Sequence, residues 1–147
     1  MERVLVVNGP NLNLLGNRDP DVYGTVTLED IERMCAERAD MLGVQVGFFQ
    51  SNHEGALIDR LQQAVGEYEA VVINAGALTH YSHALRDAID SVPIPVVEVH
   101  LSNIAAREPF RAVSVIGPAC TGSIAGFRAN SYLLGLAAAV DLLRAGS

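Results

Sequence analysis

Short runs rich in valine and isoleucine alternate with amphipathic patterns along the whole chain. The valine-rich runs predict strands, and the stretches between them carry apolar residues at helical spacing. The predicted strands are 3–8, 44–49, 70–75, 96–100 and 113–117, and the predicted helices are 28–42, 52–66, 82–91 and about 126–144. This alternation indicates an α/β protein whose parallel sheet has helices on both faces.

The rules for connecting parallel strands limit the strand orders that such a sheet can adopt. Right-handed crossovers favour a flavodoxin-like three-layer sandwich with a five-stranded parallel sheet in the order 2-1-3-4-5. A length of 147 residues suits one domain, 1–147, with one core. The segment 101–112, between the last two strands, predicts one short helix. Capping boxes are predicted at Thr27 with Asp30 and at Ser51 with Glu54.

Charge and composition exclude several classes of function. The net charge is −7, and all ten basic residues are arginines. An acidic chain does not suit the clustered phosphate contacts of a nucleic-acid binder, and without lysine neither a Schiff base nor a phosphate-loop lysine is available. The apolar run 132–143 contains Asp141 and is too short to cross a membrane. No signal peptide precedes the first strand, so we expect a cytoplasmic protein.

A long polar loop follows the first predicted strand. It covers about residues 9–26, whereas such connections usually have roughly 2–6 residues. Gly9, Gly16 and Gly24 give it hinge freedom, so we expect a lid that closes over a ligand. An inserted surface loop is the alternative.

Polar side chains gather in the segments that follow the first, third and fourth predicted strands. Ligands of open parallel sheets bind beyond the carboxyl ends of the strands, where the strand order reverses. In the order 2-1-3-4-5 this point lies between the first and third strands. We therefore expect one cleft to collect Asn11, Arg18, Tyr23, Asn74, His80, His100 and Ser102.

Two of these side chains could transfer protons. Arg18 lies on the same loop as Tyr23, and a nearby guanidinium favours the phenolate, which can act as a general base. Glu98 shares a strand face with His100 and could orient or charge the imidazole, which could then donate a proton. An un-ionised lid tyrosine and a hydrogen-bonded core histidine are the alternatives.

The remaining polar groups allow several chemistries. The backbone around Ser102 could seat a carboxylate, and Arg111 could bind hydroxyls or carboxylates. His80 and His83 could share a metal, although no cysteine supports them. No nucleotide-binding motif is present. The set fits proton abstraction beside a carbonyl followed by loss of water; a non-catalytic flavodoxin-like binding module and a metal-dependent lyase or hydrolase are the alternatives.

Four segments resemble those of the type II 3-dehydroquinate dehydratases, and the resemblance covers nearly the whole chain. They are "VNGPNLNLLGNRDPDVYG", "QSNHEGALIDRL", "INAGALTHYSHALRDA" and "VEVHLSNIAAREPFRAVS". The resemblance implies reversible dehydration of 3-dehydroquinate to 3-dehydroshikimate through an enolate, in the shikimate pathway or in quinate breakdown. It also implies a homododecamer, a tetramer of trimers, that uses neither a metal nor a cofactor.

The resemblance also assigns roles to residues. It implies that Tyr23 removes a proton from C2, that Arg18 favours the phenolate, and that Asn11 stabilises the enolate. His100, partnered by Glu98, would protonate the departing hydroxyl. The implied substrate-binding residues are Asn74, His80, Asp87, Leu101, Ser102, Arg107 and Arg111, with Asp87 reaching a neighbouring subunit's site. By this resemblance, Asp19 and Tyr81 stand where the family usually has Glu and Thr, and Arg128 stands near a usual glycine.

Overall fold

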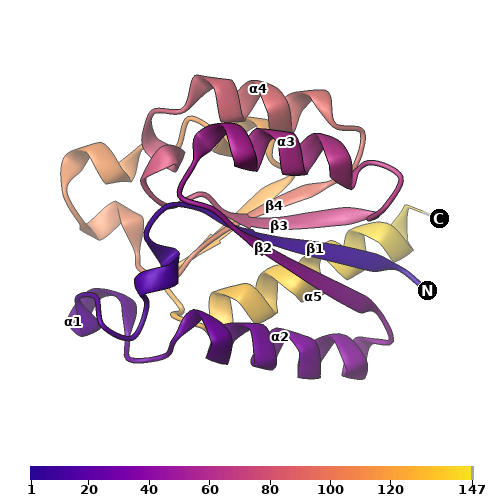
Figure 1. Ribbon diagram of the computed structural model, residues 1–147, viewed down its shortest axis with the longest axis horizontal. Coiled ribbons are helices and arrows are strands. Elements are labelled where there is room, and N and C mark those ends of the chain that lie inside the picture. The colour runs from indigo at the N-terminus through magenta and orange to yellow at the C-terminus, as the bar shows by residue number, and fades with distance from the viewer. Residues whose placement is uncertain (147) are drawn as a thin grey trace.

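The computed structural model describes residues 1–146, which form a parallel sheet between two layers of helices (Figure 1). The strands follow the order β2-β1-β3-β4-β5, and every neighbouring pair is parallel. They are β1 (Arg3–Asn8), β2 (Gln45–Gln50), β3 (Ala70–Asn74), β4 (Val96–His100) and β5 (Gly122–Ala125). Helices α3 (Glu54–Ala64) and α4 (His83–Ser91) cover one face, and α2 (Leu28–Leu42) and α5 (Asn130–Ala145) cover the other. The predicted sandwich and strand order are confirmed.

Side-chain alternation along β1 divides the core in two. Val4 and Val6 pack in the cluster that α2 and α5 cover, while Leu5 and Val7 pack in the cluster that α3 and α4 cover. All four are buried. The strand reads as an unbroken apolar run because helices lie on both faces of the sheet.

The fifth strand lies later in the chain than the sequence predicts. Residues 113–117 form no strand, and β5 pairs with β4 from Val97↔Gly122 to His100↔Ala125. The Val115 N–H instead donates to the carbonyl of Thr79, and Ile116 is buried in the core. The prediction was wrong because strand propensity depends on which neighbour a segment meets, and the valines of 113–117 meet a loop.

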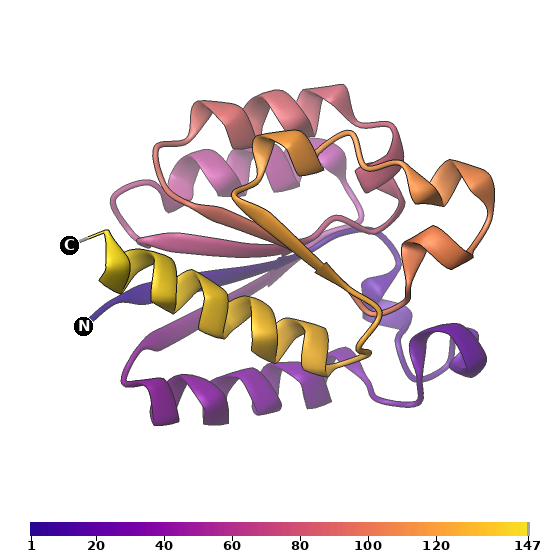
Figure 2. The same ribbon diagram turned by 180° about the vertical axis from the view of Figure 1, so that it is seen from behind.

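The connection between β4 and β5 consists of three 3₁₀ turns rather than one short helix. They are η3 (Ile104–Ala106), η4 (Pro109–Ala112) and η5 (Gly117–Ala119). A proline near the start of η4 and of η5 presets the backbone and removes an N–H that would have no partner there. In both ribbon views the turns η3 and η4 lie beyond the strand ends, on the same side of the molecule as α1 (Pro20–Tyr23) (Figure 2).

One of the two predicted capping boxes forms. Asp30 N–H donates to Thr27 Oγ1 over 3.1 Å, and Thr27 N–H donates to Asp30 Oδ2 over 3.0 Å, so α2 begins as predicted. The predicted capping box of Ser51 with Glu54 was wrong, because the N-cap of α3 is His53, which provides no side-chain cap. The Glu54 carboxylate instead accepts a hydrogen bond from the hydroxyl of Ser82, which caps α4. A tertiary contact thus replaces the local one.

The apolar run near the C-terminus forms α5 and is largely covered by the protein. Tyr132, Leu136 and Val140 are buried in the core. Gly135 lets the helix approach β4 closely, since a Cβ there would lie 2.5 Å from Val99 Cγ1. Among residues 1–146, no helix combines the length and the apolar character that a membrane span requires.

The loop 9–26 is partly ordered by the core. It contains η1 (Leu12–Leu14) and α1, and Leu12 is buried together with Leu15. Gly9 is packed rather than free, because its N–H donates to the Asn74 carbonyl over 2.8 Å. Gly16 (φ +97°) and Gly24 (φ +83°) adopt left-handed backbone on either side of α1. Glycine is therefore required at two positions that flank α1.

Gly9→Ala should destabilise the fold. A Cβ at this position would lie 2.5 Å from the Ala75 carbonyl oxygen, which belongs to the backbone and cannot move aside cheaply. We expect the free energy of unfolding, measured in urea, to fall by about 1–3 kcal/mol. Gly55→Ala is the matched control, since no atom lies within 4 Å of its Cβ; it should be neutral or stabilising by up to about 1 kcal/mol. Equal effects of the two substitutions would contradict this account.

Candidate active site

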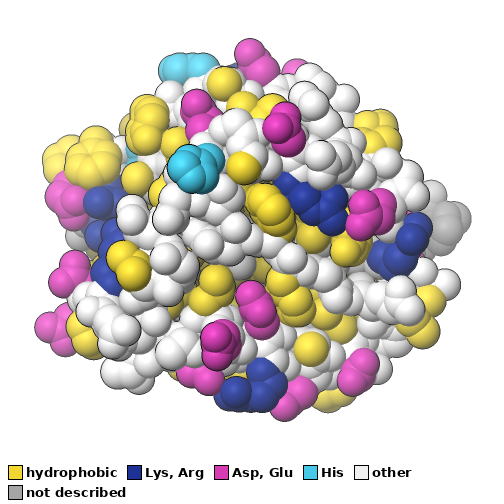
Figure 3. Space-filling model, viewed as in Figure 1, with side chains coloured by type: hydrophobic (Ala, Val, Ile, Leu, Met, Phe, Trp, Pro, Cys, Tyr) yellow, Lys and Arg dark blue, Asp and Glu magenta, His cyan; other side chains and the backbone are white. Residues whose placement is uncertain are grey.

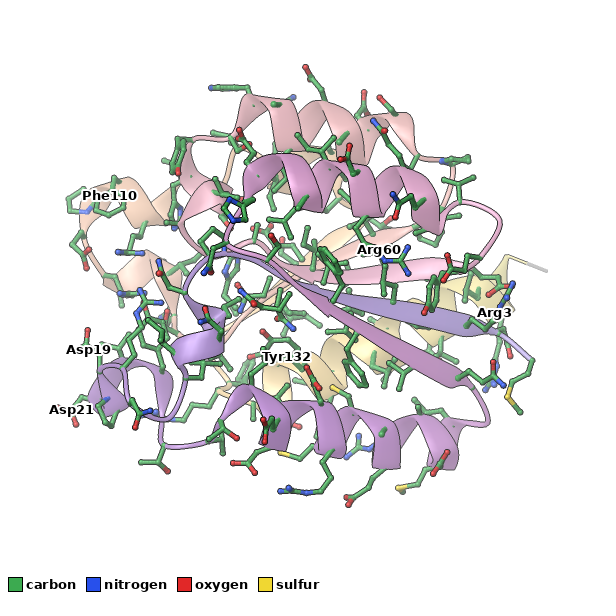
Figure 4. All side chains as sticks on the ribbon, in the orientation of Figure 1. Arg3, Asp19, Asp21, Arg60, Phe110 and Tyr132 are labelled. Atoms are coloured by element: carbon green, nitrogen blue, oxygen red, sulfur yellow. The ribbon has the colours of Figure 1, made fainter. Side chains whose placement is uncertain are left out.

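A cleft opens beyond the carboxyl ends of β3 and β4, under α1. Residues from the loop after β1, from the ends of β3 and β4, and from η3 and η4 line it. Asp19, the N-cap of α1, and Asp21 of α1 lie on one flank of this edge, and Phe110 of η4 lies on the other (Figure 4). The lining residues are Leu12, Arg18, Tyr23, Asn74, Gly76, Ala77, His80, His100, Leu101, Ser102, Ile104, Arg107 and Arg111.

Of the twelve catalytic and substrate-binding residues expected from the sequence, nine line this cleft and three do not. Glu98 lies behind His100 and contacts its ring. Asn11 is exposed and left-handed (φ 69°), and its N–H donates to Asn52 Oδ1 over 3.0 Å. Asp87 is exposed on α4. The roles of all twelve stay predictions.

Two arginines lie over the ring of Tyr23. The side chain is 7% exposed, and Cζ of Arg18 and of Arg107 lie 4.4 and 5.0 Å from the ring centre. Arg18 belongs to the loop after β1 and Arg107 to the connection after β4. The two guanidinium groups therefore lie within cation–π distance of one phenol ring.

His100 and Glu98 form a buried pair at the end of β4. Nε2 of His100 lies 2.7 Å from Oε2 of Glu98, and both residues are at least 95% buried. A carboxylate can only accept, so Nε2 carries a proton and Nδ1 is the ring nitrogen left for a ligand. A proton given to a ligand by this ring would therefore come from Nδ1.

The Glu98 carboxyl is held ionised despite its burial. Burial alone would raise its pKa, but hydrogen bonds from His100 and from the Ser114 hydroxyl, 2.7 Å away, outweigh that effect. The pKa of Glu98 therefore lies below its ordinary value. A permanent negative charge behind His100 follows from this arrangement.

His80 is arranged as a neutral hydrogen-bond acceptor. Its Nδ1 lies 2.8 Å from the Val113 carbonyl, so Nδ1 carries the proton and Nε2 keeps its lone pair. Burial lowers the pKa of His80, and the charges of His100 and Arg111 lower it further. His83 is exposed on α4. Within residues 1–146, no three histidine, cysteine or acidic side chains cluster as metal ligands do.

The cleft is positively charged although the chain as a whole is acidic. Arg107 and Arg111 share the carboxylate of Glu108 at 3.9 and 2.7 Å, and each guanidinium-bearing side chain is 17% exposed. Arg107 also donates to the hydroxyl of Ser102 over 3.4 Å. Figure 3 shows arginine side chains on the flank that carries α1, with acidic side chains beside them. These groups suit an anionic ligand.

Comparison with known proteins assigns the fold and the cleft to one family. The family described as dehydroquinase class II matches residues 2–140. The chain belongs to the class II dehydroquinases. The resemblance found in the sequence is thereby confirmed.

Relatives of known sequence and structure cover almost the whole chain. The 3-dehydroquinate dehydratase of Caldicellulosiruptor bescii is 54% identical over 97% of this chain and 99% of its own, and that of Desulforudis audaxviator is 57% identical over 98% and 96%. The crystal structure of the type II dehydroquinase from Butyrivibrio crossotus is 44% identical and superposes with a TM-score of 0.92 over 94% of this chain and 97% of that one.

Arg128 adopts left-handed backbone with φ of 52°. An L-residue is strained in this conformation, whereas glycine is not. Nη1 of Arg128 lies 3.4 Å from the Pro20 carbonyl at the start of α1. The side chain therefore contacts the loop 9–26 from the segment that precedes α5.

Sequence reasoning missed Ser114, whose hydroxyl donates to Glu98 and accepts from the N–H of Gly117 over 2.9 Å. The residue falls in the segment wrongly predicted as a strand. Its distance from Glu98 in the chain left no local signal.

Ser114→Ala should make stability depend less on pH. The folded-state pKa of Glu98 is depressed, so its stabilisation is present above the ordinary pKa and is lost as the pH falls through the lowered one. Without the serine this depression is smaller, so the variant should lose about 1–3 kcal/mol near pH 7. The deficit should shrink toward pH ~3, leaving only the lost bond to Gly117.

Urea unfolding of both proteins across this pH range measures the deficit. Ser91→Ala serves as the control, because the Ser91 hydroxyl donates to a backbone carbonyl, that of Asp87, and so contacts no titrating group through this bond. Its deficit should not change with pH. A constant deficit for Ser114→Ala as well would show that Ser114 does not depress the pKa of Glu98.

Proposed function

We propose that this 3-dehydroquinate dehydratase removes water from 3-dehydroquinate by acid–base elimination through an enolate, giving 3-dehydroshikimate. The observation that carries the proposal is the meeting of Tyr23 and His100 in one cleft, from the lid and from β4. The reaction breaks a C–H bond next to a ketone and a C–O bond one carbon further on. It therefore needs one base and one acid on either side of a small molecule.

Tyr23 is proposed as the base. Its phenolate takes the proton from C2, and the electron pair moves onto the ketone oxygen to give the enolate. The guanidinium groups of Arg18 and Arg107, 4.4 and 5.0 Å from the ring centre, support the anionic phenol. Asn11 is proposed to stabilise the enolate on the resemblance alone, since its side chain does not line the cleft.

His100 is proposed as the acid. As the enolate collapses, the C1–O bond breaks and the imidazolium of His100 protonates the leaving hydroxyl, which departs as water. The carboxylate of Glu98, 2.7 Å from Nε2, supports the charged imidazole before the transfer and fixes which nitrogen gives the proton. No further co-reactant is needed, because the proton removed from carbon and the proton given to oxygen balance.

Substrate binding is proposed to use the polar wall of the cleft. The substrate carboxylate would sit at the backbone of Leu101 and Ser102, with the positive charge of Arg107 nearby. Hydroxyls would donate to Nε2 of His80 and accept from Arg111 and Asn74. A neutral acceptor and two donors suit hydroxyl groups, which both give and take hydrogen bonds.

A homododecamer, a tetramer of trimers, is proposed on the resemblance. Asp87 is exposed on α4, outside the cleft of its own chain, which is compatible with a role in a neighbouring subunit's cleft. Sedimentation velocity measures the assembly. The cytoplasmic location expected from the sequence stays a prediction.

Tyr23→Phe should reduce turnover by about 10²- to 10⁴-fold, because the ring remains while the proton acceptor is lost. Formation of the enone of 3-dehydroshikimate, followed in the ultraviolet, measures the rate. Tyr81→Phe is the matched control, since Tyr81 is 62% exposed and lies outside the cleft lining. A folded Tyr23→Phe variant with near-wild-type turnover would remove Tyr23 from the role of base. No turnover by the folded wild type would reject the dehydratase proposal itself.

Chelator treatment should leave the activity unchanged. The proposed steps use only the phenol, the imidazole and the arginines, so removing bound metal should not alter the rate. Dialysis against a chelator, followed by the same ultraviolet assay, tests this. A loss of activity that an added divalent metal restores would favour a metal-dependent lyase that uses His80.

A further inference from the structure

Two neighbouring strands of the sheet both end in a buried asparagine. Asn8 of β1 and Asn74 of β3 are paired in register and are 1% and 4% exposed. Val6 and Val72, two residues earlier, face the cluster that α5 covers, so both asparagines point toward α5. Buried amides at this point require partners from that helix.

Tyr132 of α5 supplies the partner for both. Its hydroxyl donates to Asn8 Oδ1 over 2.6 Å and accepts from Asn74 Nδ2 over 3.0 Å. The side chain of Tyr132 is fully buried, and Figure 4 shows it between the sheet and α2. One hydroxyl on the last helix thus joins the ends of the two strands where the strand order reverses.

The backbone of Gly76 determines the direction of this chain of hydrogen bonds. Its N–H donates to Asn74 Oδ1 over 3.1 Å, and a backbone N–H can only donate. Oδ1 must therefore face Gly76, so Nδ2 faces Tyr132 and the phenolic proton goes to Asn8. If the Asn74 amide were reversed, Nδ2 would face the N–H of Gly76, and two donors would meet without an acceptor. The orientation follows from chemistry alone.

One donor of Asn74 remains unused by this network. The amide nitrogen has two protons, one of which goes to Tyr132, and Oδ1 is taken by Gly76. Asn74 lines the cleft. This N–H is the side-chain donor that Asn74 has left for a ligand, and it would select an oxygen acceptor.

We propose that Tyr132 is a positioning residue of this enzyme, which holds the Asn74 amide so that it presents an N–H to a substrate oxygen. The proposal rests on the proposed function for the identity of the substrate. Burial raises the pKa of Tyr132 far above its ordinary value, so the hydroxyl stays protonated. The direction of the network is then the same at every working pH.

Tyr132→Phe keeps the ring and removes both hydrogen bonds. Asn74 loses one of its two restraints, so kcat/KM for 3-dehydroquinate should fall about tenfold, equivalent to about 1.4 kcal/mol. The division of the loss between KM and kcat should follow that of Asn74→Ala, because both changes act at the same amide. Tyr68→Phe removes a hydroxyl from the half-buried Tyr68 of the opposite core cluster and should change kcat/KM less than about twofold.

A double-mutant cycle separates positioning from mere stability. In the Asn74→Ala background, Tyr132→Phe should lower kcat/KM by less than about twofold, because the amide it positions is gone. A hydroxyl that only stabilises the fold would lower the activity by the same factor in both backgrounds. Losses that multiply would overturn the proposal.

A readout without substrate keeps this test separate from the dehydratase assignment. The side-chain amide resonances of Asn74, identified by their absence in Asn74→Ala, should shift in Tyr132→Phe and stay in place in Tyr68→Phe. If wild type does not dehydrate 3-dehydroquinate, the proposed function fails, and this measurement still decides the network. Unchanged Asn74 resonances in Tyr132→Phe would refute the positioning role.

Discussion

The cleft exists because the chain leaves β1 and β3 toward opposite faces of the sheet. After β1 the chain continues to α2 on one face, and after β3 it continues to α4 on the other. The two connections diverge at neighbouring carboxyl ends and leave a crevice between them. The loop 9–26 forms one wall and the segment from Asn74 to His80 forms another. The end of β4 and the connection that follows it complete the lining.

Positive charge is concentrated in the cleft of an acidic chain. Burying charged groups is costly unless they are paired, and here the pairing is uneven. Glu98 is matched by His100 and Ser114, whereas Glu108 alone serves both Arg107 and Arg111. The surplus of guanidinium groups can stabilise an anion that a ligand brings or that forms during a reaction.

The edge that carries the cleft combines segments held by the core with a loop segment that lies between two left-handed glycines. Leu12 and Leu15 tie the first half of the loop 9–26 to the core, and Tyr132 ties the ends of β1 and β3 to α5. Between Gly16 and Gly24 the loop carries Arg18 and Tyr23 on the short helix α1 and its approach. Tyr23 thus sits on the segment with left-handed glycines at both ends, while Asn74 and His100 stand at the ends of strands.

The sequence predicted β1, β3 and β4 well, because strands covered on both faces read as unbroken apolar runs. It also predicted that polar residues following these strands share a cleft, since the carboxyl ends of parallel strands lie at one edge. Asn11 was expected there as well and does not line it, because its backbone is tied to Asn52 beside β2. The four resembling segments identified the family.

By itself, then, the sequence determined the layer architecture, the strand order, the family and most of the cleft, because hydrophobic period and motif spacing are local properties. Only the tertiary structure decided which segment pairs with β4 as β5, that Glu54 meets Ser82, that Ser114 contacts Glu98, and that Tyr132 contacts Asn8 and Asn74. The partners of the Tyr132 hydroxyl lie 58 and 124 residues away. Hydrogen bonds over such separations depend on how whole elements pack, and no local pattern records them.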